Sequence, residues 1–392
     1  MELTGWDIYE IAREDMPYPT WKKMREESPI LDLGDGVFFV TRWDLVNQIL
    51  RNPRLRAGDG VIASFGGGDG MAAKIMRTWL MSLDEEPHNR ARGLFHRQFT
   101  PQTINSMRDF IAKAADELVC EIEASRMGET VDLFETLAFA LPSEIIRTLI
   151  GIDSETWKSR LEPALRTDRP DELQGTGMIE AIARVLEEFV GEGNTPEGLL
   201  QRLQVSVPEF GSMSTFEVVA NGVLLVTAAV DTTAGLIGNS IRCLLERPEV
   251  VARLREDPSL VSAAVEETLR FEPSALSCSR HAPEAFSIAG VDIPAGSQLL
   301  LSLGAANRDP DRYRQPDVFD IDRDQSGILS FGAGRHFCLG AGLARAEAQI
   351  AVERLLVSGT CDYTLMGPAV WNKQNPTVRV LEQLLVQARP RH

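Results

Sequence analysis

The sequence predicts a mainly α-helical protein with minor β-sheets, folded as a single domain over residues 1–392. Two observations lead to this prediction. From Asn89 to about Leu269, apolar residues recur at helical spacing, with Pro and Gly between the segments. Strand-like stretches are short and lie before and after this helical region. No Pro/Ser-rich linker, repeat or low-complexity tract divides the chain, so one folded unit is favoured over the two or three domains that its length suggests.

The expected elements follow in chain order. Val37–Val40 is strand-like, and Trp43–Ile49 after it predicts a short helix. The six glycines within residues 58–70 predict a long loop, because glycine disfavours regular structure. Further helices are expected at Phe134–Ile150, Met178–Val190, Leu260–Phe271 and Ala341–Leu356. Strands are expected at 286–294 and Gln298–Ser302, in a hairpin pattern, and as extended stretches near Tyr363 and over Val378–Val386.

Charge and cysteine content exclude several classes of protein. The net charge of −17 argues against nucleic acid as a partner, because phosphates would be repelled. The N-terminus has no basic region before an apolar run, and the apolar stretch Val223–Val230 is far shorter than the roughly 20 residues that span a bilayer. The five cysteines are scattered and form no disulfide framework, which fits a reducing compartment. We therefore expect a soluble, cytoplasmic protein with no membrane partner.

The segment Phe331–Gly340 is the most informative part of the chain. Its three glycines predict a tight loop, with Cys338 near its end and a helix directly behind it. A helix N-terminus favours thiolate over thiol, so the loop is suited to hold a metal through sulfur. A zinc site is excluded, because no partner ligands follow at zinc spacing. A lone cysteine is more often an unreactive, partly buried residue, so the surrounding residues decide between the two interpretations.

The order Phe-Gly-x-Gly-x-His-x-Cys-Leu-Gly in this segment closely resembles the haem-binding loop of the cytochromes P-450. The resemblance extends over nearly the whole chain and implies the mainly α fold of that family. It implies haem b (iron-protoporphyrin IX) as cofactor and Cys338 as the axial iron ligand. Phe331, His336 and Gly340 are then part of the cofactor-binding loop.

The segment Glu267-Thr-Leu-Arg270 lies at the end of an expected helix. Residues three apart share a helix face, so Glu267 and Arg270 can form an ion pair. Alone, such a pair is usually a solvated surface pair of little energetic weight. Here it resembles the family's Glu-x-x-Arg signature, which implies a buried structural pair on the haem side of the core.

The apolar run Leu224–Thr233 contains one acid and two hydroxyls. An acid in a buried apolar helix is costly unless it is paired or functional. One interpretation is a cap between two helices, since Asp-Thr-Thr favours helix starts. The run also resembles the family's oxygen-binding helix, which implies that Asp231 and Thr232 deliver protons during oxygen activation. Ala229 departs from the family pattern, which has Gly at that position, and a methyl group there narrows the groove.

Haem propionates require cationic or hydrogen-bonding partners. The resemblance implies four: His88 and Arg92, one helical turn apart, with Arg280 and His336. Each taken singly is more often a solvated side chain. The residues expected to line the substrate pocket follow the family-equivalent segments: Ile62, Phe65, Leu224, Thr227, Ala275, Leu276 and Trp371. Their apolar character suggests a largely apolar small organic substrate, although such residues in a helical protein are usually core.

Electrons are expected to come from a separate acidic ferredoxin or flavodoxin with its reductase. The resemblance places five arginines on the Cys338 side of the haem, namely Arg90, Arg92, Arg97, Arg335 and Arg345. In a chain this acidic they would form a docking patch for an acidic redox protein. The alternative is that they serve only the propionates and helix caps.

Three functions compete. The resemblance favours a haem-thiolate monooxygenase that inserts one oxygen atom from O2 by hydroxylation or epoxidation, in natural-product or xenobiotic metabolism. A peroxide-driven haem peroxygenase generally lacks the acid–alcohol pair that Asp231 and Thr232 provide. A haem sensor or carrier without turnover would need neither this pair nor the arginine patch.

Overall fold

The structure is a computed structural model that describes residues 7–58, 68–124, 129–165, 175–191 and 198–391. The chain forms two compact units. Unit 1 comprises Met1–Leu55, Met107–Leu141 and Thr232–His392, and unit 2 comprises Arg56–Ser106 and Pro142–Asp231. Both are built mainly of helices, and the sheets are small, as the sequence predicts.

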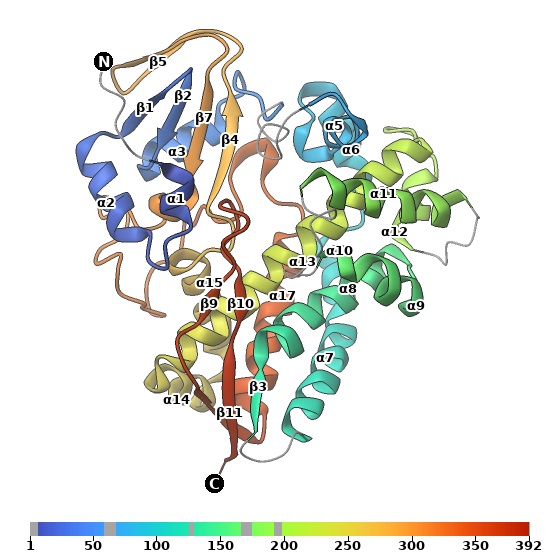
Figure 1. Ribbon diagram of the computed structural model, residues 1–392, viewed down its shortest axis with the longest axis vertical. Coiled ribbons are helices and arrows are strands. Elements are labelled where there is room, and N and C mark those ends of the chain that lie inside the picture. The colour runs from blue at the N-terminus through green and yellow to red at the C-terminus, as the bar shows by residue number, and fades with distance from the viewer. Residues whose placement is uncertain (1–6, 59–67, 125–128, 166–174, 192–197, 392) are drawn as a thin grey trace. The chain divides into compact units, whose positions relative to one another are not determined.

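Unit 1 contains a four-stranded sheet in the order β1-β2-β7-β4 (Figure 1). The strands are β1 (Ile30–Gly34), β2 (Val37–Val40), β7 (Gln298–Ser302) and β4 (Ser277–His281). β2 runs parallel to β7, and the other neighbours are antiparallel. Helix α3 (Trp43–Arg51) follows β2 and buries Leu45, Val46, Ile49 and Leu50. These residues recur at helical spacing, so the predicted strand and helix are confirmed.

The predicted hairpin is confirmed only in part. β5 (Phe286–Ile288) pairs antiparallel with β6 (Val291–Ile293). The turn residues Ala289 and Gly290 have φ of 51° and 78°, the left-handed conformation that such a two-residue turn requires. The strand at Gln298–Ser302 does not join this hairpin, because it pairs with β2 and β4 instead.

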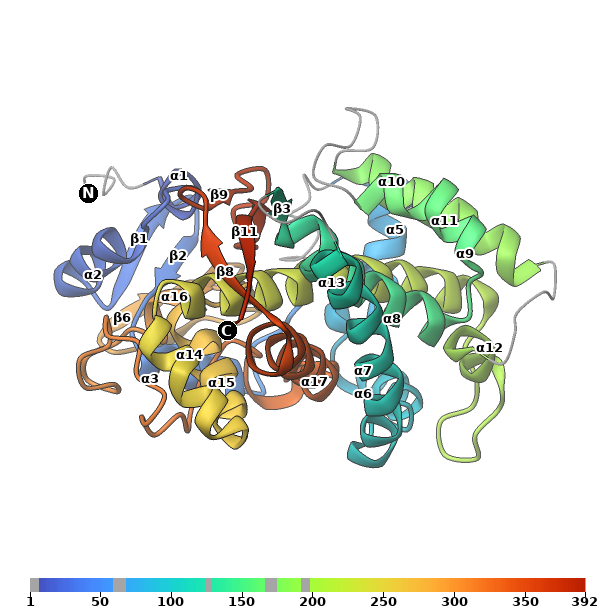
Figure 2. The same cartoon turned by 90° about the horizontal axis from the view of Figure 1, so that it is seen from below.

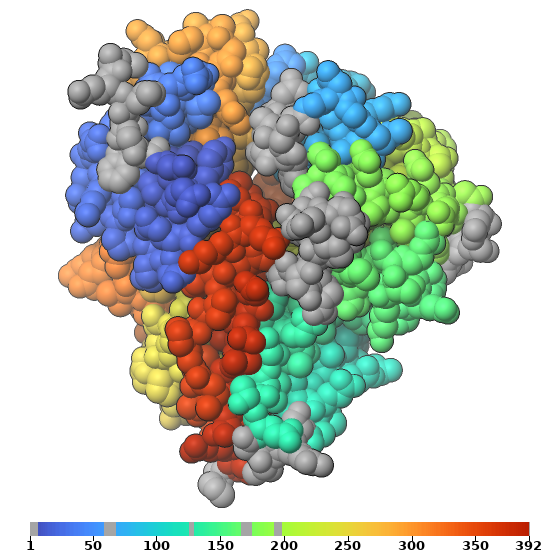
Figure 3. Space-filling view, viewed as in Figure 1, coloured from blue at the N-terminus to red at the C-terminus, as the bar shows by residue number. Residues whose placement is uncertain are grey.

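The C-terminal extended stretches belong to two further sheets. β11 (Leu385–Pro390) lies between β3 (Thr130–Asp132) and β8 (Cys361–Leu365), and pairs antiparallel with both. β9 (Val370–Trp371) pairs with β10 (Leu381–Gln383). Figure 3 shows residues of this C-terminal part, in red, against the blue N-terminal part of unit 1.

Two helices of unit 1 lie before and after the Cys338 segment along the chain. α15 (Val261–Phe271) ends at the predicted position and packs against α17 (Ala341–Val352), and the two lie beside each other in Figure 2. A π-helical segment, Glu353–Ser358, continues α17. The other helices that unit 1 holds in full are α1 (Ile8–Ala12), α2 (Tyr18–Glu27), α14 (Pro248–Glu256) and α16 (Leu303–Ala306). Helix α7 (Pro101–Ala124) and the π-helical turn Phe134–Phe139 also contribute to unit 1.

Unit 2 is helical in its described residues. It holds the α-helices α5 (Met71–Thr78), α6 (Glu85–His96), α9 (Ser154–Thr156), α10 (Glu162–Leu165), α11 (Thr176–Gly191) and α12 (Leu199–Gln204), and most of α8 (Ala140–Ile150). The predicted helices at 134–150 and 178–190 are therefore confirmed. Asn221, on the long helix Thr215–Leu245, accepts from the Leu80 N–H and donates to the Thr78 carbonyl, so it joins that helix to the end of α5.

Helix α13 (Thr215–Leu245) is the longest helix among the described residues and contributes to both units. By length and composition it could cross a membrane, but 61% of its most apolar window is buried inside the protein. Such burial is typical of the core helix of a soluble protein.

Candidate active site

The Cys338 loop has the tight conformation that its glycines predict. Gly332 and Gly334 have φ of 67° and 72°, in the left-handed region that glycine adopts without strain. The Cys338 N–H donates to the Phe331 carbonyl at 2.9 Å and closes the loop. Helix α17 begins three residues later, at Ala341. The loop therefore presents the thiol at the N-terminal end of a helix, where a thiolate is favoured.

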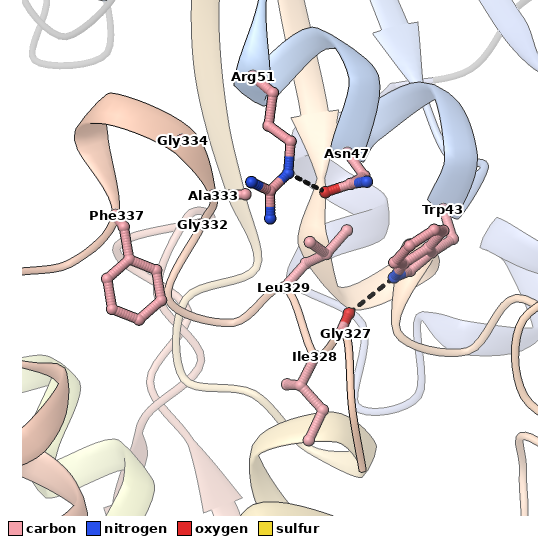
Figure 4. Close-up of a pocket in the computed structure, with 10 residues that line it drawn as sticks. All are labelled: Trp43, Asn47, Arg51, Gly327, Ile328, Leu329, Gly332, Ala333, Gly334 and Phe337. Atoms are coloured by element: carbon pink, nitrogen blue, oxygen red, sulfur yellow. Dashed lines mark hydrogen bonds between the residues drawn. The ribbon is translucent and has the colours of Figure 1, made fainter. Parts of the chain in front are cut away.

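Close packing fixes the loop against helix α3. A Cβ on Gly334 would lie 2.6 Å from the carbonyl oxygen of Leu50, so no larger residue fits there. Arg335 adds a 3.1 Å hydrogen bond to the Pro53 carbonyl. A pocket of about 450 Å³ lies between α3 and the loop, lined among others by Trp43, Arg51 and Phe337 (Figure 4).

The donor set at Cys338 fits haem and does not fit a bare metal ion. Among the described residues, no group of three or more His, Cys, Asp or Glu side chains could hold a metal. A porphyrin supplies four nitrogen ligands itself and needs only an axial ligand from the protein. The Cys338 side chain is exposed, and a Cβ on Gly340 would meet no heavy atom within 4 Å. The loop therefore has room for a large flat group beside the sulfur.

Arg280 has the surroundings of an anion-binding residue. It lies on β4 and is only 6% exposed. Its guanidinium donates to the neighbouring Ser279 carbonyl at 2.7 Å, and it has no carboxylate partner among the residues that the structure describes. A buried guanidinium without an anion is costly, so the site is suited to a propionate.

Glu267 and Arg270 form an ion pair in the core of unit 1. Both are fully buried, and two hydrogen bonds of 2.7 and 2.9 Å join the guanidinium to the carboxylate. Arg270 also donates to the carbonyls of Asn307, Pro316 and Val318. Glu267 and Arg270 therefore form a buried, fully hydrogen-bonded pair, unlike a solvated surface pair.

Asp231 and Thr232 lie within the continuous helix α13. The interpretation of this segment as a cap between two helices is therefore wrong. The helix is largely buried, but a stripe at helical spacing is half-exposed or exposed: Leu224, Thr227, Ala228, Asp231 and Thr232. A small molecule can approach the helix along this stripe. Ala229 is half-buried beside it.

The first two propionate candidates belong to unit 2. His88 and Arg92 are four residues apart on α6, so they share one face of that helix. His88 is buried and Arg92 half-buried. His336 lies in the Cys338 loop of unit 1, in the short 3-10 turn Gly334–His336, and is half-buried.

The expected pocket residues have different surroundings. Ala275 is half-buried, whereas Leu276 packs into a core cluster with Trp21 and Met24. The Trp371 ring lies against the guanidinium of Arg379, with the guanidinium carbon 3.7 Å from the ring centre. Ile62 and Phe65 lie outside the described residues.

The expected arginine patch is partly neutralised. Arg345 forms a two-fold ion pair with Glu266 and lies over the Phe331 ring. Arg90 is likewise paired, with Glu217 in unit 2. Arg97 is exposed at the end of α6, and Arg335 is half-exposed beside the Cys338 loop.

Two buried acids were missed in the sequence. Glu272 follows Phe271 at the end of α15 and accepts hydrogen bonds from Tyr18, Arg242 and Arg379. Glu347 lies inside α17, and burial raises its pKa to about 8. The helical spacing of its apolar neighbours indicated a buried face for Glu347, but no signal identified the partners of Glu272, which come from distant parts of the chain.

Comparison with known proteins agrees with this geometry. The family model described as Cytochrome P450 matches residues 198–362. Cytochrome P450 107B1 of Saccharopolyspora erythraea is 36% identical over 354 residues, which are 86% of each chain. The monooxygenase PikC of Streptomyces venezuelae is 34% identical over 95% of this chain and 91% of its own.

Solved structures show the same fold over nearly the whole chain. P450BioI, in complex with an acyl carrier protein ligated to hexadec-9Z-enoic acid, has a TM-score of 0.84 and 30% identity, and covers 97% of this chain and 100% of its own. CalO2 has a TM-score of 0.86 and 27% identity, and covers 99% of both chains. The chain therefore belongs to the cytochrome P450 family: it is a haem-thiolate monooxygenase that uses O2, a small-molecule substrate and electrons from a redox partner.

Proposed function

We propose that Cys338 is the axial thiolate and that the enzyme hydroxylates or epoxidises a largely apolar small molecule. This proposal rests on the exposed Cys338 thiol, which lies in a closed glycine loop at the start of α17. When bound, haem supplies the oxygen activation, which a thiolate ligand promotes by pushing electron density toward O–O cleavage. The protein's own residues hold the cofactor and move protons.

Cofactor binding is assigned to the residues that the family resemblance implies. Arg280, buried without a carboxylate partner among the described residues, binds a propionate, and His88, Arg92 and His336 provide further donors. Phe331 and Gly340 shape the loop around the sulfur. Glu267 and Arg270 hold the core behind this loop and take no part in the chemistry.

Proton delivery is assigned to Asp231 and Thr232. Both lie on the accessible stripe of α13, where a carboxylate beside an alcohol can organise a proton path through water. This pair distinguishes the monooxygenase from a peroxide-driven peroxygenase and from a non-catalytic haem carrier. The distinguishing measurement is product formed per reducing equivalent with O2 as the only oxidant. Turnover that required added peroxide, or no turnover at all, would contradict the proposal.

The substrate is proposed to be a largely apolar small organic molecule. Leu224, Thr227 and Ala228 on the α13 stripe, with Ala275, present no cationic group for a carboxylate. Relatives named for their substrates include a vitamin D(3) 25-hydroxylase and a 6-deoxyerythronolide B hydroxylase, 36% and 31% identical. A panel of sterols and macrolactones should therefore contain ligands that shift the Soret band by displacing the water ligand. Shifts seen only with charged compounds would contradict this substrate class.

The electron donor is proposed to be a cytoplasmic acidic ferredoxin or flavodoxin with its reductase. Arg51 is exposed and lines the pocket between α3 and the Cys338 loop. Arg335 is half-exposed in that loop and donates to the Pro53 carbonyl just after α3, and the neighbouring Arg54 is exposed. Phe337, 40% exposed, adds an apolar contact directly before Cys338 (Figure 4). A cationic rim on a chain of net charge −17 is complementary to an acidic partner.

A further inference from the structure

One carboxylate in unit 1 joins its own segment to three distant segments of the chain. Glu272 is 2% exposed and lies directly after α15. The Tyr18 hydroxyl donates to it at 2.5 Å and the Arg242 guanidinium at 2.8 Å, and Arg379 donates through Nε. These partners come from α2, α13 and the C-terminal part of the chain. We call Tyr18, Arg242, Glu272 and Arg379 the Glu272 cluster.

Glu272 supplies the negative charge that neutralises the buried arginines of this cluster. Arg242 has a second carboxylate partner, Glu246, but Glu272 is the only carboxylate paired with Arg379 among the described residues. The other Arg379 donors bind the carbonyls of Glu14 and Asp15. Burial would raise the pKa of Glu272, but the guanidiniums of Arg379, Arg242 and Arg308 hold it below its usual range. The carboxylate is therefore ionised and holds a buried cation.

Residues 377–379, which include Arg379 of the cluster, hold the segment Ser274–Leu276. The Arg379 N–H donates to the Ser274 carbonyl at 2.7 Å, and the Leu276 N–H donates to the Thr377 carbonyl at 2.9 Å. Ala275 and Val378 form an antiparallel bridge between these bonds. The position of Ala275 is therefore set by residues 377–379, which Arg379 anchors to Glu272.

Helix α13 closes the other side of this segment. The Asn239 side-chain amide donates to the carbonyls of both Glu272 and Arg379. A Cβ on Gly235 would lie 2.8 Å from Ser274 Cβ and 3.1 Å from the Arg379 carbonyl oxygen, so helix and segment touch directly. Gly235 lies three residues after Thr232, one helical turn away. The cluster thus fixes the distance between Ala275 and the turn of α13 that carries Thr232.

We infer that Glu272 and Arg379 are positioning residues that set the shape of the substrate pocket by holding the Ser274–Leu276 segment, and Ala275 within it, at helix α13. In this role they act through the Ser274–Leu276 segment rather than by contact with substrate or cofactor. This inference rests on the proposed function of Ala275 and Thr232. It assigns to a buried ion pair a role in selecting ligands by shape, in addition to its contribution to stability.

The test compares two haem-iron ligands of different size, imidazole and 4-phenylimidazole, by titrating the Soret shift of the holoenzyme. Tyr18→Phe, Arg379→Lys and Glu272→Gln should weaken 4-phenylimidazole binding relative to imidazole binding by roughly threefold to tenfold, with the smallest change for Tyr18→Phe. Tyr18→Phe loses a single hydrogen bond and keeps the measurement possible if Glu272→Gln does not fold. Glu272→Asp, which keeps the charge, should restore most of the wild-type ratio.

The control is Ile111→Ala, which leaves a cavity in α7 and involves no residue of the Glu272 cluster. It should lower the melting temperature and leave the ratio of the two affinities unchanged. If the cluster variants lost stability but kept the wild-type ratio, the cluster would be structural only and the inference would be overturned. A wild-type protein whose Soret band did not respond to imidazole would overturn the proposed haem site itself.

Discussion

Arg270 and Glu267 form a fully buried ion pair in which every side-chain nitrogen of the arginine is hydrogen-bonded. Nε and one terminal nitrogen bind the carboxylate, and the terminal nitrogens also bind three backbone carbonyls. Glu267 in turn accepts the Asp320 N–H at 2.9 Å. The pair thus connects α15 with the chain between Asn307 and Asp320, ahead of the Cys338 loop.

Glu267→Gln or Arg270→Leu should destabilise the fold by about 3–5 kcal/mol. The first leaves the buried Arg270 guanidinium without its carboxylate, and the second leaves the Glu267 carboxylate with only the more distant Arg323, at 3.5 Å. Chemical denaturation of the holoenzyme measures this loss. Arg253→Gln breaks the exposed pair with Asp322 on the same unit and is the matched control, with little expected change. Equal stability of both variant types would mean that the buried pair contributes no more than a surface pair.

Cys338→Ala should abolish the absorption band that thiolate-ligated haem shows after reduction and binding of carbon monoxide. The thiolate is the only protein donor proposed for the iron, so no other residue replaces it. Cys120→Ser, which changes another exposed cysteine, should keep the band. Retention of the band in Cys338→Ala, or its loss in Cys120→Ser, would show that the ligand is assigned wrongly.

Helices and loops whose conformation depends on neighbouring residues could be predicted from the sequence. The glycine loop before α17 and the helix α3 follow from glycine conformation and apolar spacing, and both are present. The strand at Gln298–Ser302 was predicted as a strand but assigned the wrong partner. Strand pairing depends on which distant segment buries the same face, and β7 shares its core with β2 and α3.

The candidate site shows the same division. The Glu267–Arg270 pair was accessible to sequence reasoning because both residues are on one helix. The pairing of Arg345 with Glu266 and of Arg379 with Glu272 was not, because the partners are 79 and 107 residues apart. An arginine that pairs with a carboxylate from a distant part of the chain no longer offers its charge to a partner at the surface. Local sequence spacing does not show which arginines are paired in this way.

Thr232→Ala should divert reducing equivalents to hydrogen peroxide while substrate-induced spectral shifts persist. Loss of the hydroxyl interrupts proton delivery without changing the apolar lining, so product formation should fall on the order of 100-fold. Product and peroxide per NADH consumed provide the measurement. Thr233→Val changes the neighbouring, buried hydroxyl and should keep wild-type coupling. Unchanged coupling in Thr232→Ala would remove Thr232 from the proton path.

Arg335→Gln and Arg51→Gln should each raise the KM for an acidic ferredoxin several-fold and leave substrate binding unchanged. Arg51 lines the pocket beside Phe337, and Arg335 donates to the Pro53 carbonyl just after α3, whereas Arg345 is paired with Glu266. Partner-supported turnover should also fall with rising salt, since exposed charges are screened over about 8–10 Å at physiological ionic strength. Arg253→Gln, which removes an exposed arginine elsewhere, is the control. Turnover insensitive to salt and to both Arg335→Gln and Arg51→Gln would place the partner on another surface.

Arg97→Gln tests an exposed arginine of unit 2 that is expected to take part in donor binding. Arg97 is exposed at the end of α6, and its loss should raise the same KM. Peroxide-driven turnover needs no docking and should be unaffected by the substitution. A fall in peroxide-driven turnover would instead indicate that Arg97 supports haem binding.

The buried acid Glu347 should make the protein less stable as pH rises. Burial raises its pKa to about 8 from an ordinary value of 4.5, so the folded protein keeps a proton that the unfolded chain releases between these values. The contribution of this protonated acid is fully present below pH 4.5 and is lost as pH rises toward 8. The slope is at most about 1.4 kcal/mol per pH unit.

Glu347→Gln stays neutral at every pH. Between pH 5 and 8, its free energy of unfolding should therefore fall less than that of the wild type, because this pH range lies between the ordinary and the raised pKa of Glu347. Denaturant titrations at several pH values provide the measurement. Glu353→Gln, which replaces a half-buried acid paired with Arg354, should keep the wild-type slope. Parallel stability curves for the wild type and Glu347→Gln would mean that Glu347 is ionised in the folded protein, with a partner that offsets the cost of its burial.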